Sequence, residues 1–277
     1  MMNIRMLPVA GLIGALGMAL IGQTVLAPQA VAASVTLQPH QAHYRLETTE
    51  VRMPGAGASL PGEFIVRLQK RCTGWVLLTQ LTLGLEVSNG QILEIESIGA
   101  AEESLDGRGM SFESKLRMNN ELIESLKGTA ALNADGTGVV NITVPEAQTL
   151  PLPKGTIFSV SAFHDTVGKI LAGEKIVNYI LFDGSTPEPI RGTDVVVGPA
   201  KPMDEPPEGD ADLIEGPGWQ VVTSFYGLND TDAHPLVTNT AHVFANGITT
   251  RISLDIGLAV TDGTLTLLQA LPEPSCP

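Results

Sequence analysis

The chain has few aromatic and few basic residues, and both shortages restrict the classes of partner that it can bind. Phe, Trp and Tyr make up 4% of its 277 residues, and 16 Lys and Arg stand against 30 Asp and Glu, a formal charge of −14 at pH 7. Attraction to phosphate backbones and anionic headgroups depends on Lys and Arg density. Platforms that stack bases combine aromatic with basic residues. The composition therefore argues against nucleic-acid partners and against peripheral membrane adhesion.

Sequence signatures of catalysis are also missing. The chain contains no G-x-S-x-G elbow, H-E-x-x-H pair, P-loop, G-x-G-x-x-G turn or EF-hand loop. We therefore expect no enzymatic activity, no cofactor and no metal, with a hydrolase of unrecognised site as a remote alternative. The histidines do not stand among acids or cysteines at metal-ligand spacing, and we interpret all five as structural or surface residues: His40, His43, His164, His234 and His242.

The first 33 residues have the order of a secretory signal. Arg5 precedes the apolar run 6–26 and the small residues 30–33, Ala-Val-Ala-Ala, which match the positive start, hydrophobic middle and A-x-A exit of such signals. About twenty apolar residues just span a bilayer, so a retained anchor is the alternative, although interspersed glycines dilute the run. We predict a cleaved signal over 1–33 and one exported domain over 34–277.

Cysteine is limited to Cys72 and Cys276, which lie 204 positions apart. An even cysteine count in an exported chain favours a disulfide. A loop of this length stabilises the folded state by about 5 kcal/mol in the chain-entropy model, and the bond would hold a tail that otherwise frays. Intermolecular pairing and metal binding stay open as alternatives, although two ligands alone make a poor zinc site.

Most of the chain alternates between apolar and polar residues with a period of two. Phe64, Val66 and Leu68 share one face while Arg67 and Gln69 take the other, as in a half-buried strand. We predict a mainly all-β domain with the antiparallel topology of a meander. The expected strands, about a dozen, cover 43–48, 62–71, 75–87, 92–98, 111–118, 122–132, 138–144, 176–182, 194–197, 219–226, 236–245, 248–256 and 265–271.

Pairs of Asn or Asp with Gly separate many of these runs. Such pairs supply the positive φ angles that tight hairpins require, so each predicts a hairpin. They are Asn89-Gly90, Asp106-Gly107, Asp135-Gly136, Asp183-Gly184, Asn246-Gly247 and Asp262-Gly263.

One segment has helical rather than alternating periodicity. Between 161 and 171, Phe163, Val167 and Ile170 recur at helical spacing. With Ser161 as N-cap and Gly173 as the residue that ends it, the segment predicts one short helix against the sheet.

Residues 198–218 are rich in proline and acid. Such a segment buries too little apolar surface to offset the entropy of ordering, which predicts a mobile loop. The proposed disulfide joins residues on both sides of it, so we place the loop inside a single domain.

The two tryptophans, Trp75 and Trp219, are the candidate groove or core aromatics. A curved sheet buries aromatics on its concave face, where they line a ligand cavity or simply fill the core.

Several short motifs in a fixed order resemble the cell-envelope-integrity EipB family of Gram-negative bacteria. They are Cys72-Thr73-Gly74-Trp75, Glu102-Glu103, Phe112, Gly155, the His164 helix that ends in Leu171-Ala172-Gly173-Glu174, Phe182-Asp183-Gly184, and the cysteine that follows Leu268-Gln269-Ala270-Leu271. The similarity covers nearly the whole exported chain. It departs from the family's pattern in the acidic loop and at 159–163.

The resemblance implies a periplasmic β-spiral, a broken, overlapping, half-open barrel of 12–14 strands like those of the lipoprotein carriers LolA and LolB. It also implies a disulfide between Cys72 and Cys276 and a non-enzymatic role in envelope integrity. The expected partners are periplasmic or envelope proteins bound in a groove or along sheet edges. Carriage of lipid or lipoprotein acyl chains is the alternative, and we expect a monomer.

Overall fold

A computed structural model describes most of the chain beyond the predicted signal. The signal over 1–33 and Asn89 of the first predicted hairpin lie outside the described residues. Within the described part, no helix combines the length and hydrophobicity that crossing a bilayer requires. The described residues are 35–52, 59–87, 90–231, 234–255, 257 and 259–276.

In this part of the chain, sixteen strands belong to one sheet, and fifteen of them form a continuous hydrogen-bonded path. The elements, in chain order, are β1 (His40–Val51), β2 (Ser59–Lys70), β3 (Gly74–Val87), β4 (Gln91–Ser104), β5 (Gly109–Met118), β6 (Glu121–Leu132), β7 (Gly138–Val144), β8 (Gln148–Leu152), β9 (Thr156–Phe158), α1 (Ser159–Leu171), β10 (Ile176–Phe182), β11 (Ile190–Pro199), β12 (Glu208–Gly209), η1 (Ala211–Leu213), β13 (Gly218–Gly227), β14 (Val237–Phe244), β15 (Thr249–Asp255) and β16 (Ala259–Ala270).

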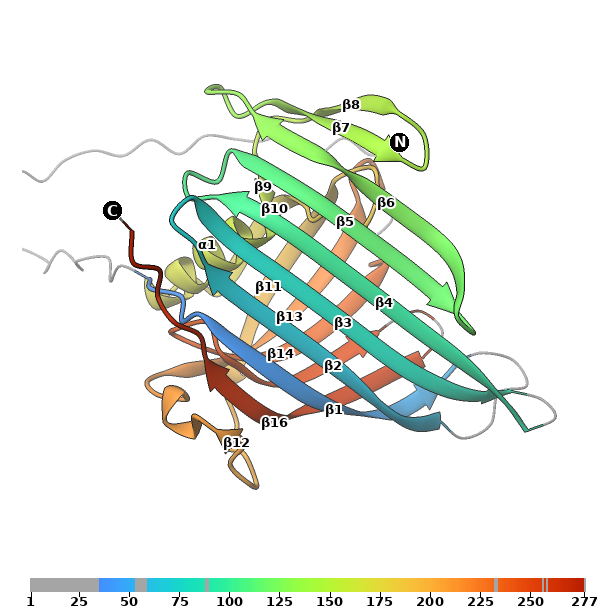
Figure 1. Cartoon of the computed structure of the whole chain (residues 1–277). Helices are drawn as coiled ribbons and strands as arrows, with labels where there is room; N and C mark the ends of the chain where they lie inside the picture. The colour runs from blue at the N-terminus through green and yellow to red at the C-terminus, as the bar shows by residue number, and fades with distance from the viewer. Residues whose placement is uncertain are drawn as a thin grey trace, which may run out of the picture. The chain divides into compact units, whose positions relative to one another are not determined.

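The path curls into a nearly closed barrel (Figure 1). From β1, strands β2 to β8 follow in order on one side, while β16, β15, β14, β13, β11, β10 and β9 follow on the other. The end strands β8 and β9 pair with no strand on their outer edges among the described residues, so one seam stays unsealed. The predicted broken barrel with a single short α-helix is confirmed.

The prediction of a simple meander was wrong at two places. The first and last strands pair with each other, with Ala42 opposite Leu268. In addition, β9 and β10 are parallel, because α1 provides the crossover that a parallel pair needs. Strands β8, β9 and β12 were not predicted, since runs of five, three and two residues show no measurable alternation.

Side chains rather than backbone hydrogen bonds pack the two sides of the seam together. Phe112 on β5 meets Phe182 on β10 edge to face, with ring centroids 5.3 Å apart, and Phe182 in turn meets Phe158 on β9. Gly184 lies against the Phe112 ring at φ +75°, where a Cβ would be 2.6 Å from Cγ. The part of the sheet formed by β5–β8 therefore packs over the end formed by β9 and β10, so the two ends of the spiral overlap.

One predicted hairpin was wrong. Asp262 and Gly263 lie inside β16, opposite Ser253 and Ile252 of β15. A Cβ on Gly263 would come within 2.6 Å of the Ile252 side chain. This glycine therefore permits close packing in a strand rather than a turn.

The acidic segment 198–218 is partly built into the sheet. Its ends belong to β11 and β13, and β12 pairs with β16 at Leu267 and Leu268, beyond the residues that β15 occupies. The Asp210 carboxylate accepts the Ala270 amide hydrogen at 2.7 Å, and Asp204 forms an ion pair with Arg251. The mobility of the segment stays a prediction.

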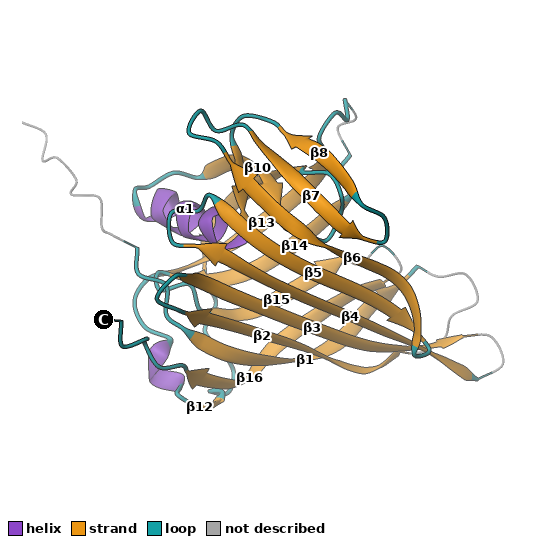
Figure 2. Ribbon diagram, turned by 45° about the horizontal axis from the view of Figure 1, so that its top comes forward, coloured by secondary structure: helices purple, strands orange, loops and turns teal. Residues whose placement is uncertain are grey.

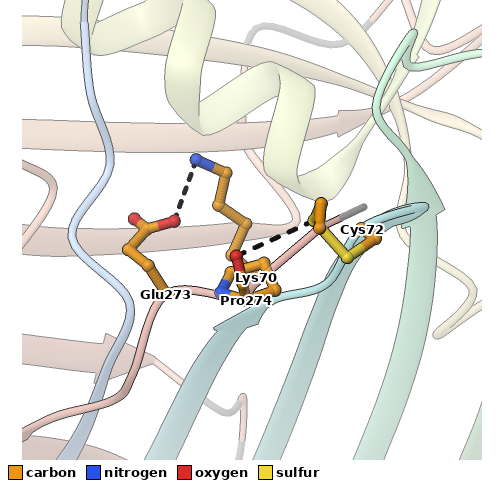
Figure 3. The surroundings of a disulfide bond; sticks show 5 residues. Lys70, Cys72, Glu273 and Pro274 are labelled. Atoms are coloured by element: carbon orange, nitrogen blue, oxygen red, sulfur yellow. Dashed lines mark hydrogen bonds and ion pairs between the residues drawn. A yellow bond between two sulfur atoms is a disulfide. The ribbon is translucent and has the colours of Figure 1, made fainter.

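The disulfide joins the β2–β3 turn to the C-terminal tail. Cys72 and Cys276 are bonded, with Cα atoms 5.5 Å apart, within the range that a disulfide spans. Figure 3 shows Lys70 beside the bond, its ammonium 3.1 Å from the carboxylate of Glu273 in the same tail. The tail is thereby fixed next to the start of β3.

We predict that opening this bond destabilises the fold. Reduction of the wild type, or Cys72→Ser with Cys276→Ser, should lower the free energy of unfolding by about 2–5 kcal/mol, because the unfolded chain regains the entropy of a long loop. Chemical denaturation with and without reductant measures the change. Reductant should not affect the double variant, and superimposable wild-type curves in the two conditions would contradict the prediction.

Candidate functional site

Helix α1 lies inside one end of the barrel. Figure 1 shows it between the strands around β2–β5 and those around β11–β14, and Figure 2 shows the same placement from a second direction. On one side Val160 packs with Leu68 of β2. On the other, Val167 and Ile170 pack with Val221 of β13. The helix therefore spans the interior and closes off part of it.

Between α1 and the strands is a cavity of about 370 Å³, within the range of small-molecule sites. Most of its lining is apolar or aromatic, contributed by β1, β2, β10, β13 and β14 as well as α1. Its larger side chains include Tyr44, Phe64, Phe163, Tyr179, Leu181 and Phe225.

A carboxyl group interrupts this apolar lining. Asp194 on β11 is 5% exposed and accepts hydrogen bonds from three hydroxyls: Thr223 at 2.6 Å and Tyr179 at 3.1 Å on Oδ1, and Thr166 of α1 at 2.8 Å on Oδ2. No ion pair to Asp194 occurs within the described residues. The group is hydrogen-bonded but has no cation beside it.

Strand register brings these groups together. Asp194 lies directly opposite Thr223 in the β11–β13 ladder, and Tyr179 faces Gly192 in the β10–β11 ladder. Because Gly192 carries no side chain, the Tyr179 ring leans over it, where a Cβ would overlap the ring. The phenol oxygen then reaches the carboxyl group two residues further along β11.

Burial governs ionisation in the cavity. It raises the pKa of Asp194, an effect that the three hydroxyl hydrogen bonds partly oppose. Burial lowers the pKa of His40, whose Nδ1 is 2.7 Å from the Gln38 carbonyl oxygen, and raises the pKa of Tyr44 and Tyr179. At neutral pH the imidazole and both phenols are uncharged, so Asp194 is the group that can carry charge here.

A second buried carboxyl group holds the start of α1. Glu103 on β4 is 2% exposed and accepts the amide hydrogens of Val160 at 2.8 Å and Ser161 at 3.0 Å, together with the Ser161 hydroxyl. These amides belong to the first turn, which has no intrahelical acceptors. Burial raises the pKa of Glu103, and the hydrogen bonds from Ser161 and Val160 oppose the shift.

This arrangement corrects the predicted start of the helix. Helix α1 begins at Ser159, and the side chain of its N-cap residue, Phe158, makes no capping hydrogen bond. Ser161 is therefore not the N-cap residue but lies in the first turn. Glu103, a glutamate from a distant strand, caps the helix in its place. The predicted end is confirmed, with Gly173 at φ +96° just beyond the last turn.

Comparison with known proteins agrees with this architecture. The family model described as EipB-like matches residues 31–272. The chain belongs to the EipB-like family. It is 26% identical over 230 residues to the cell envelope integrity protein EipB of Brucella abortus (strain 2308), which covers 82% of this chain and 81% of that protein.

A solved structure supports the same conclusion. The crystal structure of a β-barrel-like protein of a domain of unknown function from Brucella abortus superimposes with a TM-score of 0.77 at 25% identity. The match covers 86% of this chain and all of the other. Likeness to an envelope-integrity protein, together with the disulfide, indicates that this EipB-like chain works outside the cytoplasm.

The two tryptophans do not line the cavity of this EipB-like barrel. Trp75 packs near Val160, with the Lys70 ammonium 5.6 Å from its ring centre. Trp219 packs in the cluster that contains Val167 and Val221. Both residues are half-buried, and Trp219 also lines a separate surface pocket with Pro199 and Pro217, so the assignment to groove or core stays a prediction.

The histidines are dispersed over the fold. His40 lines the cavity, His43 lies 3.2 Å from Glu63, and the His164 ring contacts the Val35 carbonyl oxygen at 3.1 Å. Within the described ranges, no three His, Cys, Asp or Glu side chains are arranged to hold a metal. That the protein uses no metal stays a prediction.

Sequence reasoning did not single out Asp194, although a signal for it was present. Asp194 falls two residues from Val196 and therefore on the same face of its predicted strand. An acidic residue on the apolar face of a strand is unusual, since carboxylates are rarely buried without a partner. Its partners come from α1, β10 and β13, which only the fold assembles.

We predict that Glu103→Gln lowers the free energy of unfolding by about 1–3 kcal/mol. The glutamine side chain replaces one acceptor oxygen by an NH₂ group, which faces the N–H groups of the first turn of α1 and leaves buried N–H groups without an acceptor. Glu102→Gln is the matched control, because Glu102 is exposed and its pairing with Arg71 at 3.4 Å lies on the surface. Urea denaturation measures both variants. Hydrogen exchange at Val160 and Ser161 should accelerate for Glu103→Gln alone; equal effects of the two variants would refute the cap.

A pH dependence follows from the raised pKa of Asp194. A carboxyl whose pKa is higher in the folded state stabilises that state when protonated, and this contribution is lost as pH rises through the folded pKa. The unfolding free energy of wild type minus that of Asp194→Asn should therefore fall as pH increases from about 4, the ordinary aspartate value, to 8. Denaturation at several pH values measures this difference, and a difference that rises with pH would contradict the assignment.

Proposed function

We propose that this protein is a non-enzymatic periplasmic protein that supports envelope integrity by holding the apolar part of an envelope component inside its barrel. Membership of the EipB-like family supports the cellular role. The disulfide supports an oxidising compartment such as the periplasm. The mainly apolar cavity of about 370 Å³ under α1 is the observation that carries the binding role.

Acyl chains of lipids or lipoproteins are the envelope components that such a cavity suits. Apolar surface transferred from water into an apolar site contributes roughly 25 cal/mol per Å². Phe64 and Leu77 on one wall and Phe225 and Val243 on the other would contact a chain along its length. Because α1 forms part of the wall, a bound chain would be shielded from water.

The arrangement of the hydroxyl and carboxyl groups supports a non-enzymatic role. Ser161 donates to Glu103, yet Glu103 is 2% exposed and its oxygens are occupied by the first turn of α1. Catalysis by a serine nucleophile needs a base that can receive the hydroxyl proton and a reachable substrate. A carboxylate committed to capping a helix serves neither purpose.

An exposed sheet edge favours a second candidate, binding of an envelope protein. Strand β7 pairs with β6 only from Lys127 onward, so the first half of β6 has one strand neighbour among the described residues. Leu122 is 52% exposed and Ile123 48% exposed there. Such an edge can accept an extended segment of another protein.

The cavity hypothesis predicts that filling the barrel blocks an apolar probe. Ala241 lines the cavity, so Ala241→Phe should weaken binding of dodecanol at least tenfold. Thr240→Phe, on the opposite face of β14, is the control and should bind within twofold of wild type. Isothermal titration calorimetry measures both, with unfolding midpoints to verify the folds. Unchanged binding by a folded Ala241→Phe would exclude the cavity.

The cellular role predicts a phenotype. Deleting the gene should sensitise cells to detergent several-fold, and wild-type protein and Thr240→Phe should both restore resistance. Ala241→Phe, exported at the same level, should not restore it. Full rescue by Ala241→Phe would separate the cellular role from the cavity and favour the β6 edge.

A further inference from the structure

The charge of the cavity is one-sided. Among its lining residues within the described part of the chain there is one acid, Asp194, and there is no Lys or Arg. His40 is neutral because burial lowers its pKa. Asp194 is therefore the lining residue that can present a charge to a ligand inside the barrel, and that charge is negative.

Among the described residues, the carboxyl group of Asp194 has hydrogen-bond donors but no cationic partner. A carboxylate offers about four lone-pair sites, and the hydroxyls of Thr223, Tyr179 and Thr166 take three of them. Among the residues that the structure describes, Thr166 is the one donor to Oδ2. Burying a carboxylate without a cation costs desolvation free energy, and a nearby ammonium ion offsets that cost.

Anionic ligands are disfavoured by the same arrangement. A fatty-acid carboxylate beside Asp194 would place two like charges in an environment of low dielectric constant, where repulsion is strong. The hydroxyls beside Asp194, those of Thr166, Tyr179 and Thr223, already donate to it. Neutral chains gain the apolar contact but leave the carboxylate without a cation.

We propose that the cavity selects amphiphiles whose apolar chain ends in a protonated amine, with the ammonium ion bound to Asp194 Oδ2 and the chain packed among the aromatic and aliphatic side chains. This inference rests on the proposed function, since it requires that the cavity binds an apolar chain. A volume of about 370 Å³ lies near the lower end of small-molecule pockets, which favours a single-chain ligand.

Calorimetry of the disulfide-bonded protein with three matched probes tests the proposal. At pH 7 and below micelle-forming concentrations, dodecylamine should bind at least tenfold more tightly than dodecanol, and dodecanoate more weakly than either. This comparison needs no variant. Equal binding of dodecylamine and dodecanol would overturn the amine selection and leave the proposed function standing, whereas absence of binding by all three would overturn both.

Two variants assign the selection to Asp194. Asp194→Asn should abolish the preference, so that dodecylamine and dodecanol bind this variant within twofold of each other. Asp262→Asn, which removes the same charge from an exposed position on β16, should keep the preference. Persistence of the preference in a folded Asp194→Asn would overturn the assignment, since the attraction would then arise from the general negative charge of the protein.

A headgroup probe distinguishes the two sources of an amine. Lysophosphatidylethanolamine carries the ammonium beside a phosphate, and dodecylamine carries it alone. Lysophosphatidylethanolamine that binds as tightly as dodecylamine, and more tightly than lysophosphatidylglycerol, would identify an aminolipid headgroup. Weaker binding of both lysolipids than of dodecylamine would identify a free long-chain amine.

Discussion

The pairing of β1 with β16 is the constraint on which the other features depend. It joins the two ends of the folded chain over eleven residue pairs and converts two runs of strands into one curved wall. Because β16 ends beside the start of β1, the tail passes close to the β2–β3 turn, and Cys276 reaches Cys72. The same pairing places His40 and Tyr44 of β1 on the cavity wall.

The interior of the barrel has to be filled by side chains or by another element, and α1 fills one end of it. Two buried carboxyl groups position the helix from different strands: Glu103 of β4 binds its first turn, and Asp194 of β11 binds Thr166 in its middle. Neither carboxyl group has a basic partner in the described structure. Helix donors satisfy Glu103, whereas Asp194 accepts three hydroxyl hydrogen bonds and lines the apolar cavity.

The cavity connects the fold to the role that the family suggests. The binding role that we propose requires an apolar site, and the mainly apolar cavity beside α1 is of that kind. Under our proposal its chemistry is more specific than that of a purely apolar pocket, because the single acid in the lining, Asp194, would select the head group of a ligand while the apolar wall would accommodate its chain. The aromatic side chains of Phe112, Phe158 and Phe182 pack the seam, and the disulfide lies elsewhere, between the β2–β3 turn and the C-terminal tail.

The sequence by itself determined the local features. Period-two alternation gave the bounds of β7 and β10, the spacing of Val167 and Ile170 gave the helix, and Gly173 gave its end, because these depend on neighbouring residues. The tertiary structure decided the β1–β16 closure, the place of Asp262-Gly263 within β16, and the capping of α1 by Glu103. It also decided that Asp194 meets three hydroxyls, since register and packing between distant segments leave no periodic trace along the chain.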